Sequence, residues 1–325
     1  MGDLALAVDT GKNATKAVSR INGSLQKFAF RTKMQIVENF DIDIPRDTYL
    51  TELEGNHYLV GEAVGEEHSN YDLSKHSVEH RVAIYLAIAL FLERKGPHFG
   101  EVPTVSLAIN VPVSLYKNAS QKARYTDFIQ TNHEVVSMVV NGRTHRFRIN
   151  QVLALPEGMG PIYNQIDRYR GERAIIFDIG GLNTSYSVYD QLVPKIDSMF
   201  GGNQGIHSLR AAIQEALTST YGVSVSTEDA ERVMVDGRFA MNGVPLPDSA
   251  TLIEKLKHQH VESILAFAKA HGLTLNNSTL VFAGGGSVLL QEAIEEMLPT
   301  AVVDEAGRYS NVLSYHRLME AKDLV

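Results

Sequence analysis

The chain has 325 residues, enough for about two domains, and its 44% hydrophobic and 21% charged residues are typical of a globular protein. Its formal net charge of -8, from 38 acidic and 30 basic residues, argues against a broad nucleic-acid-binding face. The absence of cysteine excludes disulfides, thiolate zinc sites and thiol catalysis, and with the lack of a visible signal peptide it leads us to expect a cytoplasmic protein.

The first part of the chain is predicted to form strands joined by tight turns. Residues 4–8 and 15–21 are apolar runs typical of strands. An Asn-Gly pair after the second run predicts a hairpin into a third strand near residues 25–31. Residues 49–64 predict another hairpin, which turns at Gly55-Asn56.

A helix is predicted over residues 78–94, ended by Gly96-Pro97. Its apolar core is too short to span a bilayer and is typical of a helix buried in a domain core. Residues 104–112 predict a buried strand, residues 119–132 a helix and residues 135–149 a hairpin on an Asn-Gly turn.

The second half also mixes strands and helices, and the whole pattern indicates an α/β protein. Strands are expected at residues 174–181, 184–190 and 192–200, helices at 206–221, 227–235 and 249–271, and a strand, glycine turn and helix over 279–298.

Two stretches share one form: an apolar strand, Asp, any residue, Gly and a returning strand. They are LALAVDTGKNATKAV, which contains Asp9, and RAIIFDIGGLNTSYSV, which contains Asp178. Asp-x-Gly alone occurs by chance, but this ordered pair, followed by the glycine triplet of VFAGGGS, is more specific. Two such hairpins can face each other across a cleft, where turn amides hold phosphate oxygens.

The residue types at these positions suit a nucleoside triphosphate. Asp9 and Asp178 would hold a hydrated Mg²⁺, because hard cations prefer oxygen ligands. Lys16 would reach the phosphates as a point charge, and Gly284-Gly285-Gly286 would let the backbone approach an adenine or its ribose. The alternative interpretations are an exposed turn for Asp9, an edge-strand charge for Lys16 and a merely flexible glycine turn.

In these motifs the chain resembles the actin/Hsp70/sugar-kinase superfamily, and within it the bacterial actin-like plasmid-segregation ATPases of the ParM type. DTGKNATK is similar to the first phosphate loop, FDIGG to the second, and LVFAGGGSVLL to the adenosine loop. LALPEGMGPIY resembles the connecting segment, KIDSMFGGNQGIHSLRAAIQEAL the strand, turn and helix beside the nucleotide, and RYSNVLSYHRLMEA the closing helix. The resemblance covers nearly the whole chain.

The resemblance implies an α/β, actin-like (ribonuclease H-like) two-domain fold with a nucleotide cleft between the domains. Domain I would span residues 1–150, with the last helix, residues 309–322, packing back on it. Domain II would span residues 151–308, with an inserted helical subdomain at about residues 205–275.

The resemblance also implies roles for individual residues. Glu157, in the Pro-Glu pair of the connecting segment, would orient the attacking water, while Asp9 and Asp178 would organise Mg²⁺ through its waters. The nucleotide would be bound by Thr10, Gly11, Lys12, Asn13, Lys16, Gly180, Gly181, Leu182, Asn183, Gly202, Gly284, Gly285, Gly286 and Ser287.

The second loop departs from the family's pattern, which places threonines and an acidic residue after Asp-x-Gly-Gly. Here Leu182-Asn183-Thr184-Ser185 follows, which leaves Asn183 and backbone amides near the γ-phosphate. Lys12 stands where related loops often carry a small hydroxyl residue. We expect nucleotide binding to be retained and the hydrolysis rate to be affected.

The implied function is that of a filament-forming ATPase whose subunits join head to tail. Binding of ATP, or GTP, with Mg²⁺ would drive polymerisation, and slow hydrolysis would destabilise the filament. The cargo would be plasmid DNA held through a DNA-binding adaptor protein, because the acidic chain shows no basic arm or helix-turn-helix. The tail HRLMEAKDLV has little apolar face, so we expect no membrane attachment.

Two other functions fit parts of the sequence. A small-molecule kinase of the same superfamily would need a catalytic base beside a hydroxyl substrate pocket, for which no clear candidate is seen. HSVEH at residues 76–80 fits the inverted zinc-peptidase pattern, with His76 and His80 on one helix face, Glu79 as base and Glu157 as a third ligand. The simpler interpretation of this stretch is a solvated helix start.

Overall fold

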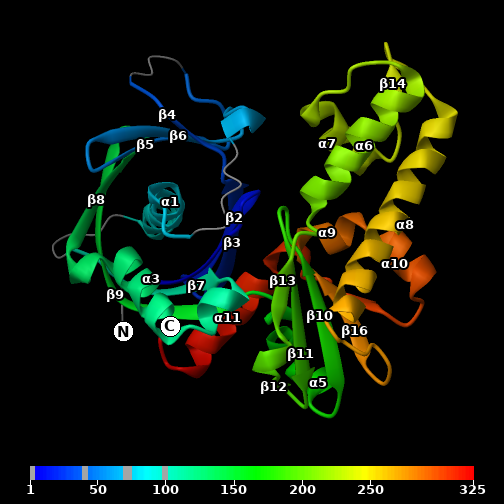
Figure 1. The fold of residues 1–325 in the computed structure, drawn as a ribbon. Helices are drawn as coiled ribbons and strands as arrows, with labels where there is room; N and C mark the ends of the chain where they lie inside the picture. The colour runs from blue at the N-terminus through cyan, green and yellow to red at the C-terminus, as the bar shows by residue number, and fades with distance from the viewer. Residues whose placement is uncertain (1–3, 39–42, 69–74, 97–101) are drawn as a thin grey trace. The chain divides into compact units, whose positions relative to one another are not determined.

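The chain folds into two units in the computed structural model, which describes residues 4–38, 43–68, 75–96 and 102–325 (Figure 1). Unit 1 consists of Met1–Asn164 and Asn311–Val325, and unit 2 of Gln165–Ser310. The chain therefore leaves unit 1, forms unit 2 and returns to unit 1 at its end. It leaves unit 1 after Asn164, whereas we placed this passage at residue 150.

Unit 1 is built on a nine-stranded sheet in the order β3-β2-β1-β7-β9-β8-β5-β6-β4. The neighbours β1, β7 and β9 run parallel, and the other neighbouring pairs are antiparallel. The strands are β1 (Leu4–Thr10), β2 (Ala14–Ile21), β3 (Ser24–Arg31), β4 (Met34–Ile36), β5 (Thr48–Leu53), β6 (Asn56–Gly61), β7 (Thr104–Val111), β8 (Val135–Val140) and β9 (Arg143–Pro156).

The hairpins expected from turn residues are present. β2 and β3 are joined at Asn22-Gly23, β5 and β6 at Glu54-Gly55, and β8 and β9 at Asn141-Gly142. Both residues of each pair have a positive φ, as in the type I′ turns that match the right-handed twist of paired strands. The second turn lies one residue earlier than predicted.

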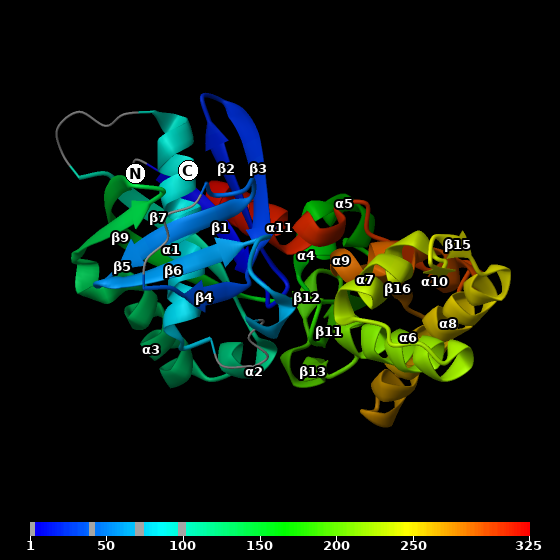
Figure 2. The same ribbon diagram turned by 90° about the horizontal axis from the view of Figure 1, so that it is seen from above.

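Helix α1 (Val78–Lys95) lies inside the curve of this sheet, which surrounds it on several sides (Figures 1 and 2). A helix that is apolar all round must be buried on all faces, and this one contacts β1, β2, β8 and β9. Ser77 caps its first turn by accepting the His80 N–H at 3.3 Å. The helix ends at Gly96, where φ is 103°, and Pro97 lies outside the described residues. None of the described helices combines the length and apolar character needed to cross a bilayer.

Short helices complete unit 1. They are α2 (Val113–Tyr116), α3 (Ala119–Gln130), α4 (Gly160–Asn164) and α11 (Ser310–Ala321). The last of these is the helix expected at residues 309–322. The Tyr315 hydroxyl donates to the Pro156 carbonyl at 3.0 Å, and Arg20 pairs with Glu320 at 2.8 Å, which ties α11 to β9 and β2.

Unit 2 has a six-stranded sheet in the order β12-β11-β10-β16-β17, with β13 paired to β11, and a separate two-stranded hairpin. β10, β16 and β17 run parallel. The strands are β10 (Arg173–Ile179), β11 (Thr184–Asp190), β12 (Val193–Pro194), β13 (Phe200–Gly202), β14 (Ala240–Met241), β15 (Val244–Pro245), β16 (Thr279–Ala283) and β17 (Val302–Val303). The helices are α5 (Ile166–Tyr169), α6 (Ile206–Tyr221), α7 (Thr227–Asp236), α8 (Pro247–Ala270), α9 (Gly284–Leu289) and α10 (Gln291–Met297).

Two local predictions for unit 2 were wrong. Residues 192–200 do not form one strand, because Pro194 has no N–H to continue a ladder and a 3₁₀ turn over Ile196–Ser198 separates β12 from β13. The glycine triplet is not a turn before a helix. Helix α9 begins at Gly284 itself, directly after β16.

Candidate functional site

The first Asp-x-Gly loop is the tight turn between β1 and β2. Asp9 and Lys16 lie opposite each other in the strand register, and the Lys16 ammonium is 3.4 Å from Asp9 Oδ2. The Gly11 N–H donates to the Ala14 carbonyl at 3.1 Å, and a Cβ at Gly11 would lie 2.9 Å from that oxygen. Only glycine therefore fits the turn without a shift of its backbone, and the turn brings the carboxylate and the amine together.

Thr32 supports this loop from the segment after β3. Its hydroxyl donates to the Gly11 carbonyl at 2.7 Å, and its N–H donates to the Asn13 carbonyl at 3.2 Å. Lys12 lies between these two residues in the same turn. Thr32, which no sequence motif marks, therefore fixes the backbone of the first loop at Gly11 and Asn13.

Thr10 ends β1 with its hydroxyl oxygen buried, and among the residues that the structure describes this oxygen has no hydrogen-bond partner. The Thr10 N–H donates to Asn110 Oδ1 at 2.9 Å, so its backbone is anchored while its side chain is not. A buried hydroxyl without a partner costs about 1–3 kcal/mol of folding free energy. A ligand oxygen at the end of β1 would satisfy it, so this position fits a bound phosphate.

Glu157 follows β9 and is tied to the end of β1 by two donors. Lys75 Nζ lies 2.9 Å and Asn110 Nδ2 lies 3.0 Å from Glu157 Oε1. Lys75 also donates to the Thr10 carbonyl at 3.2 Å. Thr10, Asn110 and Glu157 come from the carboxyl ends of the adjacent parallel strands β1, β7 and β9, the edge of a parallel sheet at which ligands usually bind.

The second Asp-x-Gly loop has the same design in unit 2. Asp178 lies near the end of β10 with 9% of its surface exposed, and the Gly180 N–H donates to the Asn183 carbonyl at 2.9 Å. A Cβ at Gly180 would lie 2.9 Å from the same carbonyl. The Thr184 hydroxyl donates to the Gln204 carbonyl at 2.7 Å. The hydroxyl that follows Asn183 is therefore engaged within the protein, which leaves Asn183 and the amides as the loop's donors.

Helix α6 begins directly against this loop. The Gly180 and Gly181 carbonyls accept the Ile206 and His207 N–H groups at 3.0 and 2.8 Å. A Cβ at Gly205 would lie 2.3 Å from the Leu182 carbonyl carbon. The start of α6 thus fixes the path of the loop.

The glycine triplet lies beside Asp178, because β16 runs parallel to β10. Gly284 has φ +84°, and a Cβ there would lie 2.5 Å from Asp178 Oδ1. A Cβ at Gly286 would lie 2.3 Å from Ile179 Cγ2, whereas Gly285 has room for a side chain, with Arg308 Cβ nearest at 3.6 Å. Close packing against Asp178 and Ile179, together with the positive φ, therefore requires glycine at position 284 and sets the start of α9 beside the carboxylate.

Two further predicted residues have structural roles in unit 2. The Ser287 hydroxyl is buried and donates to the Gly284 carbonyl of its own helix at 2.9 Å. A Cβ at Gly202 would lie 2.5 Å from Phe267 Cε1. The packing of α8 thus explains why glycine occupies position 202.

Replacing Gly205 by alanine should destabilise unit 2 by about 1–3 kcal/mol and weaken nucleotide binding, because the methyl group meets loop backbone that must move. Gly205 has φ -81°, which alanine adopts freely, so the effect is steric. The matched control is Gly171→Ala, where nothing lies within 4 Å. Urea unfolding and nucleotide titration of both variants measure the difference. Equal stabilities would contradict a fixed loop.

The histidine motif at residues 76–80 does not form a zinc site. His76 precedes the cap residue Ser77, and its ring packs on Tyr125 and Phe128. His80 is buried, and its Nε2 shares a hydrogen bond of 2.6 Å with the Tyr125 hydroxyl. Across the described ranges, no group of three or more His, Cys, Asp or Glu side chains could hold a metal ion. The alternative of a solvated helix start was also wrong for His80.

Acid should weaken the fold through His80. Burial, with the Lys75 and Lys12 ammonium groups nearby, lowers the pKa of His80 well below its usual value. The unfolded chain binds a proton here below about pH 6.5 and the folded chain does not, so stability falls by up to about 1.4 kcal/mol per pH unit below that value. Urea unfolding at pH 7.5 and 5.5 should show a smaller pH dependence in His80→Gln. The half-exposed His57→Gln should behave as wild type.

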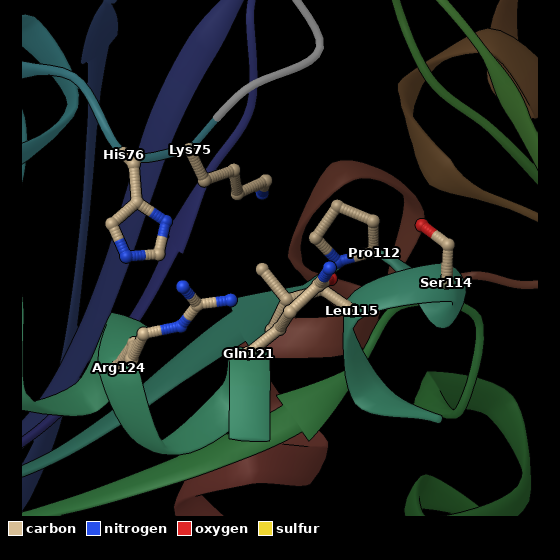
Figure 3. A pocket seen from close by; sticks show the side chains of 7 residues that line it. All are labelled: Lys75, His76, Pro112, Ser114, Leu115, Gln121 and Arg124. Carbon is tan, nitrogen blue, oxygen red and sulfur yellow. The ribbon is translucent and has the colours of Figure 1, made fainter. Parts of the chain in front are cut away.

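A pocket of about 460 Å³ opens beside the segment that carries Lys75 (Figure 3). Lys75 and His76 enter it from the residues before α1, and Arg124 enters from α3 on the opposite side (Figure 3). The lining residues are Lys75, His76, Pro112, Ser114, Leu115, Gln121 and Arg124. Lys75 therefore borders both this pocket and the Glu157 carboxylate.

Comparison with known proteins identifies the fold of the chain. Residues 7–160 match the family model described as the N-terminal domain of actin-like proteins. No curated protein sequence matches the chain.

Solved structures with this fold cover nearly all of the chain. A 15-stranded ParM filament from Clostridium botulinum matches with a TM-score of 0.79 at 15% identity, covering 99% of this chain and 100% of that one. Ta0583, an archaeal actin homologue also solved with ADP, matches with a TM-score of 0.76 at 17% identity over 98% of this chain and 99% of that one. The Alp12 filament matches with a TM-score of 0.71 at 24% identity over 99% and 100%. The predicted α/β, actin-like two-domain fold is thus confirmed.

Proposed function

We propose that the chain is an actin-like, filament-forming ATPase, a proposal supported by the match of residues 7–160 to the N-terminal domain of actin-like proteins. The observation that carries the proposal is the cluster at the carboxyl ends of β1, β7 and β9. There the Asp9–Lys16 pair, the buried Thr10 hydroxyl, which none of the described residues satisfies, and the Glu157 carboxylate lie on neighbouring strands and turns. Such a set suits a phosphate group and a water to be oriented beside it.

In the proposed mechanism both loops serve one nucleotide, ATP or GTP. Lys16 and the amides of the two loops stabilise phosphate charge, and Gly284 lets the backbone approach the nucleoside. Mg²⁺, held through its waters by Asp9 and Asp178, would supply neutralisation of phosphate charge. Asp9 and Asp178 lie near the ends of β1 and β10, and carboxylate oxygens are the ligands that Mg²⁺ prefers. Glu157 orients the attacking water, so the protein contributes position and electrostatics rather than a covalent intermediate.

Assembly is proposed to follow nucleotide state. Nucleotide binding would favour a conformation that joins head to tail with further copies, because a ligand shifts the population toward the state it prefers. A heterologous contact of this kind does not close and therefore yields a filament. The filament structures of Alp12 and of the Clostridium ParM support self-association as the starting hypothesis.

The proposed cargo is plasmid DNA, attached through a separate DNA-binding adaptor. The net charge of -8 supports indirect rather than direct contact with DNA. Proteins that bind DNA directly neutralise its phosphates with many lysines and arginines and thereby release counterions. Tight, sequence-specific DNA binding by the purified chain alone would contradict this part of the proposal.

Sedimentation tests the proposed function most directly. The purified chain is centrifuged with Mg²⁺ and ATP, GTP, ADP or no nucleotide, and phosphate release is measured in the same samples. We expect a pellet with the triphosphate, a smaller one with ADP and none without nucleotide. A chain that binds ATP but stays in the supernatant at every concentration, and phosphorylates a small hydroxyl compound, would instead be a kinase.

A further inference from the structure

Lys75 joins two parts of the candidate site that no sequence motif connects. We infer that Lys75 is a positioning residue, which holds the Glu157 carboxylate at the first phosphate loop so that it can orient the attacking water. This inference rests on the proposed ATPase function and adds to it a residue on which hydrolysis depends.

Lys75 contacts both Glu157 and the end of β1. Its ammonium donates to Glu157 Oε1 at 2.9 Å and to the Thr10 carbonyl at 3.2 Å. The Asn110 side chain makes a parallel connection, because its Nδ2 donates to Glu157 Oε1 and its Oδ1 accepts the Thr10 N–H. One carboxylate oxygen therefore accepts hydrogen bonds from two different elements, and both donor residues are also hydrogen-bonded to the backbone of Thr10.

The burial of this pair supports a specific role. The Lys75 side chain is 7% exposed and the Glu157 side chain 15%. Lysine is almost never buried to this degree without a charged partner, since desolvation of an ammonium is costly. If Lys75 and Glu157 served only to fill space, apolar side chains of similar volume would stabilise the fold equally well, because the desolvation cost of a buried ion pair offsets its attraction. This ion pair lies against Thr10, whose buried hydroxyl no described residue satisfies, and so it keeps a charged carboxylate in a fixed orientation where a phosphate would bind.

A direct phosphate contact is the competing role for Lys75. Lys16, on β2, already supplies an ammonium at the first loop, 3.4 Å from Asp9. Lys75 points its ammonium at Glu157 and at a carbonyl oxygen, both of which are acceptors. If Lys75 acts through Glu157, its loss should slow hydrolysis with little effect on nucleotide affinity, whereas loss of a phosphate ligand would weaken both.

The test is a double-mutant cycle with Lys75→Met and Glu157→Gln in the full chain, read by ATP affinity and single-turnover phosphate release. Lys75→Met should slow phosphate release by about ten- to a hundredfold, because a misplaced catalytic group costs rates of that order. The Kd of Lys75→Met for ATP should stay within about threefold of the wild-type value. A slower rate at unchanged affinity indicates an interaction that acts in the transition state and not in ATP binding. In the Glu157→Gln background the same change should alter the rate less than about twofold, since residues that act as a unit are not additive.

Two variants complete the design. Lys75→Arg keeps the positive charge and should recover part of the lost rate. Lys255→Met removes an exposed lysine on α8 and should leave both readouts unchanged. Circular dichroism verifies folding, and if Lys75→Met does not fold, Lys75→Gln keeps a donor to Glu157 without the charge and enters the same cycle.

The outcomes separate this inference from the proposed function. If wild type hydrolyses ATP and Lys75→Met matches it, or if Lys75→Met loses affinity as much as rate, Lys75 is not a positioning residue and the proposed ATPase stands. Additive effects in the Glu157→Gln background would also overturn the inference. A wild-type chain that neither binds nor hydrolyses nucleotide would overturn the proposed function and the inference with it.

Discussion

Replacing Glu157 by alanine should slow phosphate release by about a hundredfold or more while the chain still assembles with ATP, because a positioned acid–base or water-orienting group contributes rate factors of that order. The change leaves Asp9, Lys16 and the second loop intact. If nucleotide binding drives growth and hydrolysis drives disassembly, the variant should form filaments that persist after wild-type filaments have shortened. Light scattering and phosphate release are followed on the same sample.

Glu157→Ala must be compared with a second variant, because the alanine also removes the partner of the buried Lys75 ammonium. Alanine leaves the buried Lys75 ammonium without its partner, and the loss of one member of a buried pair costs about 3–5 kcal/mol of stability. Glu157→Gln keeps an acceptor for Lys75 and Asn110 and should reproduce the slow hydrolysis with a smaller loss of stability. Glu134→Ala, an exposed glutamate in the same unit, is the matched control. Hydrolysis at the wild-type rate in both Glu157 variants would mean that the carboxylate only supports the fold.

Replacing Asp178 by alanine should remove most of the nucleotide affinity that depends on Mg²⁺. Loss of a carboxylate that holds a metal through its waters typically lowers metal affinity by about ten- to a hundredfold. Asp178 lies near the end of β10, and its Oδ1 is so close to Gly284 that a Cβ there would lie at 2.5 Å. The carboxylate and the glycine triplet would therefore act on the same ligand.

Titration of a fluorescent ATP analogue with Mg²⁺ and with a chelator measures this effect. Wild type should bind far more tightly with Mg²⁺, and Asp178→Ala should bind about equally in the two conditions. Asp167→Ala, whose side chain is fully exposed in the same unit, should keep the wild-type difference. Unchanged Mg²⁺-dependent binding in Asp178→Ala would remove this loop from the site.

Several features of the site could be predicted because they depend on neighbouring residues. Apolar runs that end on Asp9 and Asp178 identify two strands with a carboxylate at or near the end, and the following glycines identify the turns. Each of the three Asn-Gly pairs, at residues 22–23, 141–142 and 242–243, forms the turn of a hairpin, and the first two hairpins were predicted. Positive φ at both turn residues fixes the register of the flanking strands. The unbroken apolar run at residues 82–92 of α1 required a buried helix, which the surrounding sheet provides.

Other features depend on contacts between distant parts of the chain. Lys75 and Glu157 are 82 positions apart, and nothing in the residues around Lys75 marks it as part of a site. Asn110 stands out in the sequence only as a polar residue near the end of the apolar strand β7, which does not reveal its contact with Glu157. The close packing of Gly205 against Leu182 and of Gly202 against Phe267 likewise joins segments that no local pattern relates.

The sequence by itself determined most of the longer strands, the predicted hairpins and the positions of the two carboxylates, because backbone preferences and the alternation of apolar residues act over a few positions. Only the tertiary structure decided which side chains meet. The strand order brings the carboxyl ends of β1, β7 and β9 to one edge, and Lys75, three residues before α1, reaches that edge with its ammonium. Burial then selects the partners there, since an ammonium and a carboxylate removed from water are stable only when each lies against the other.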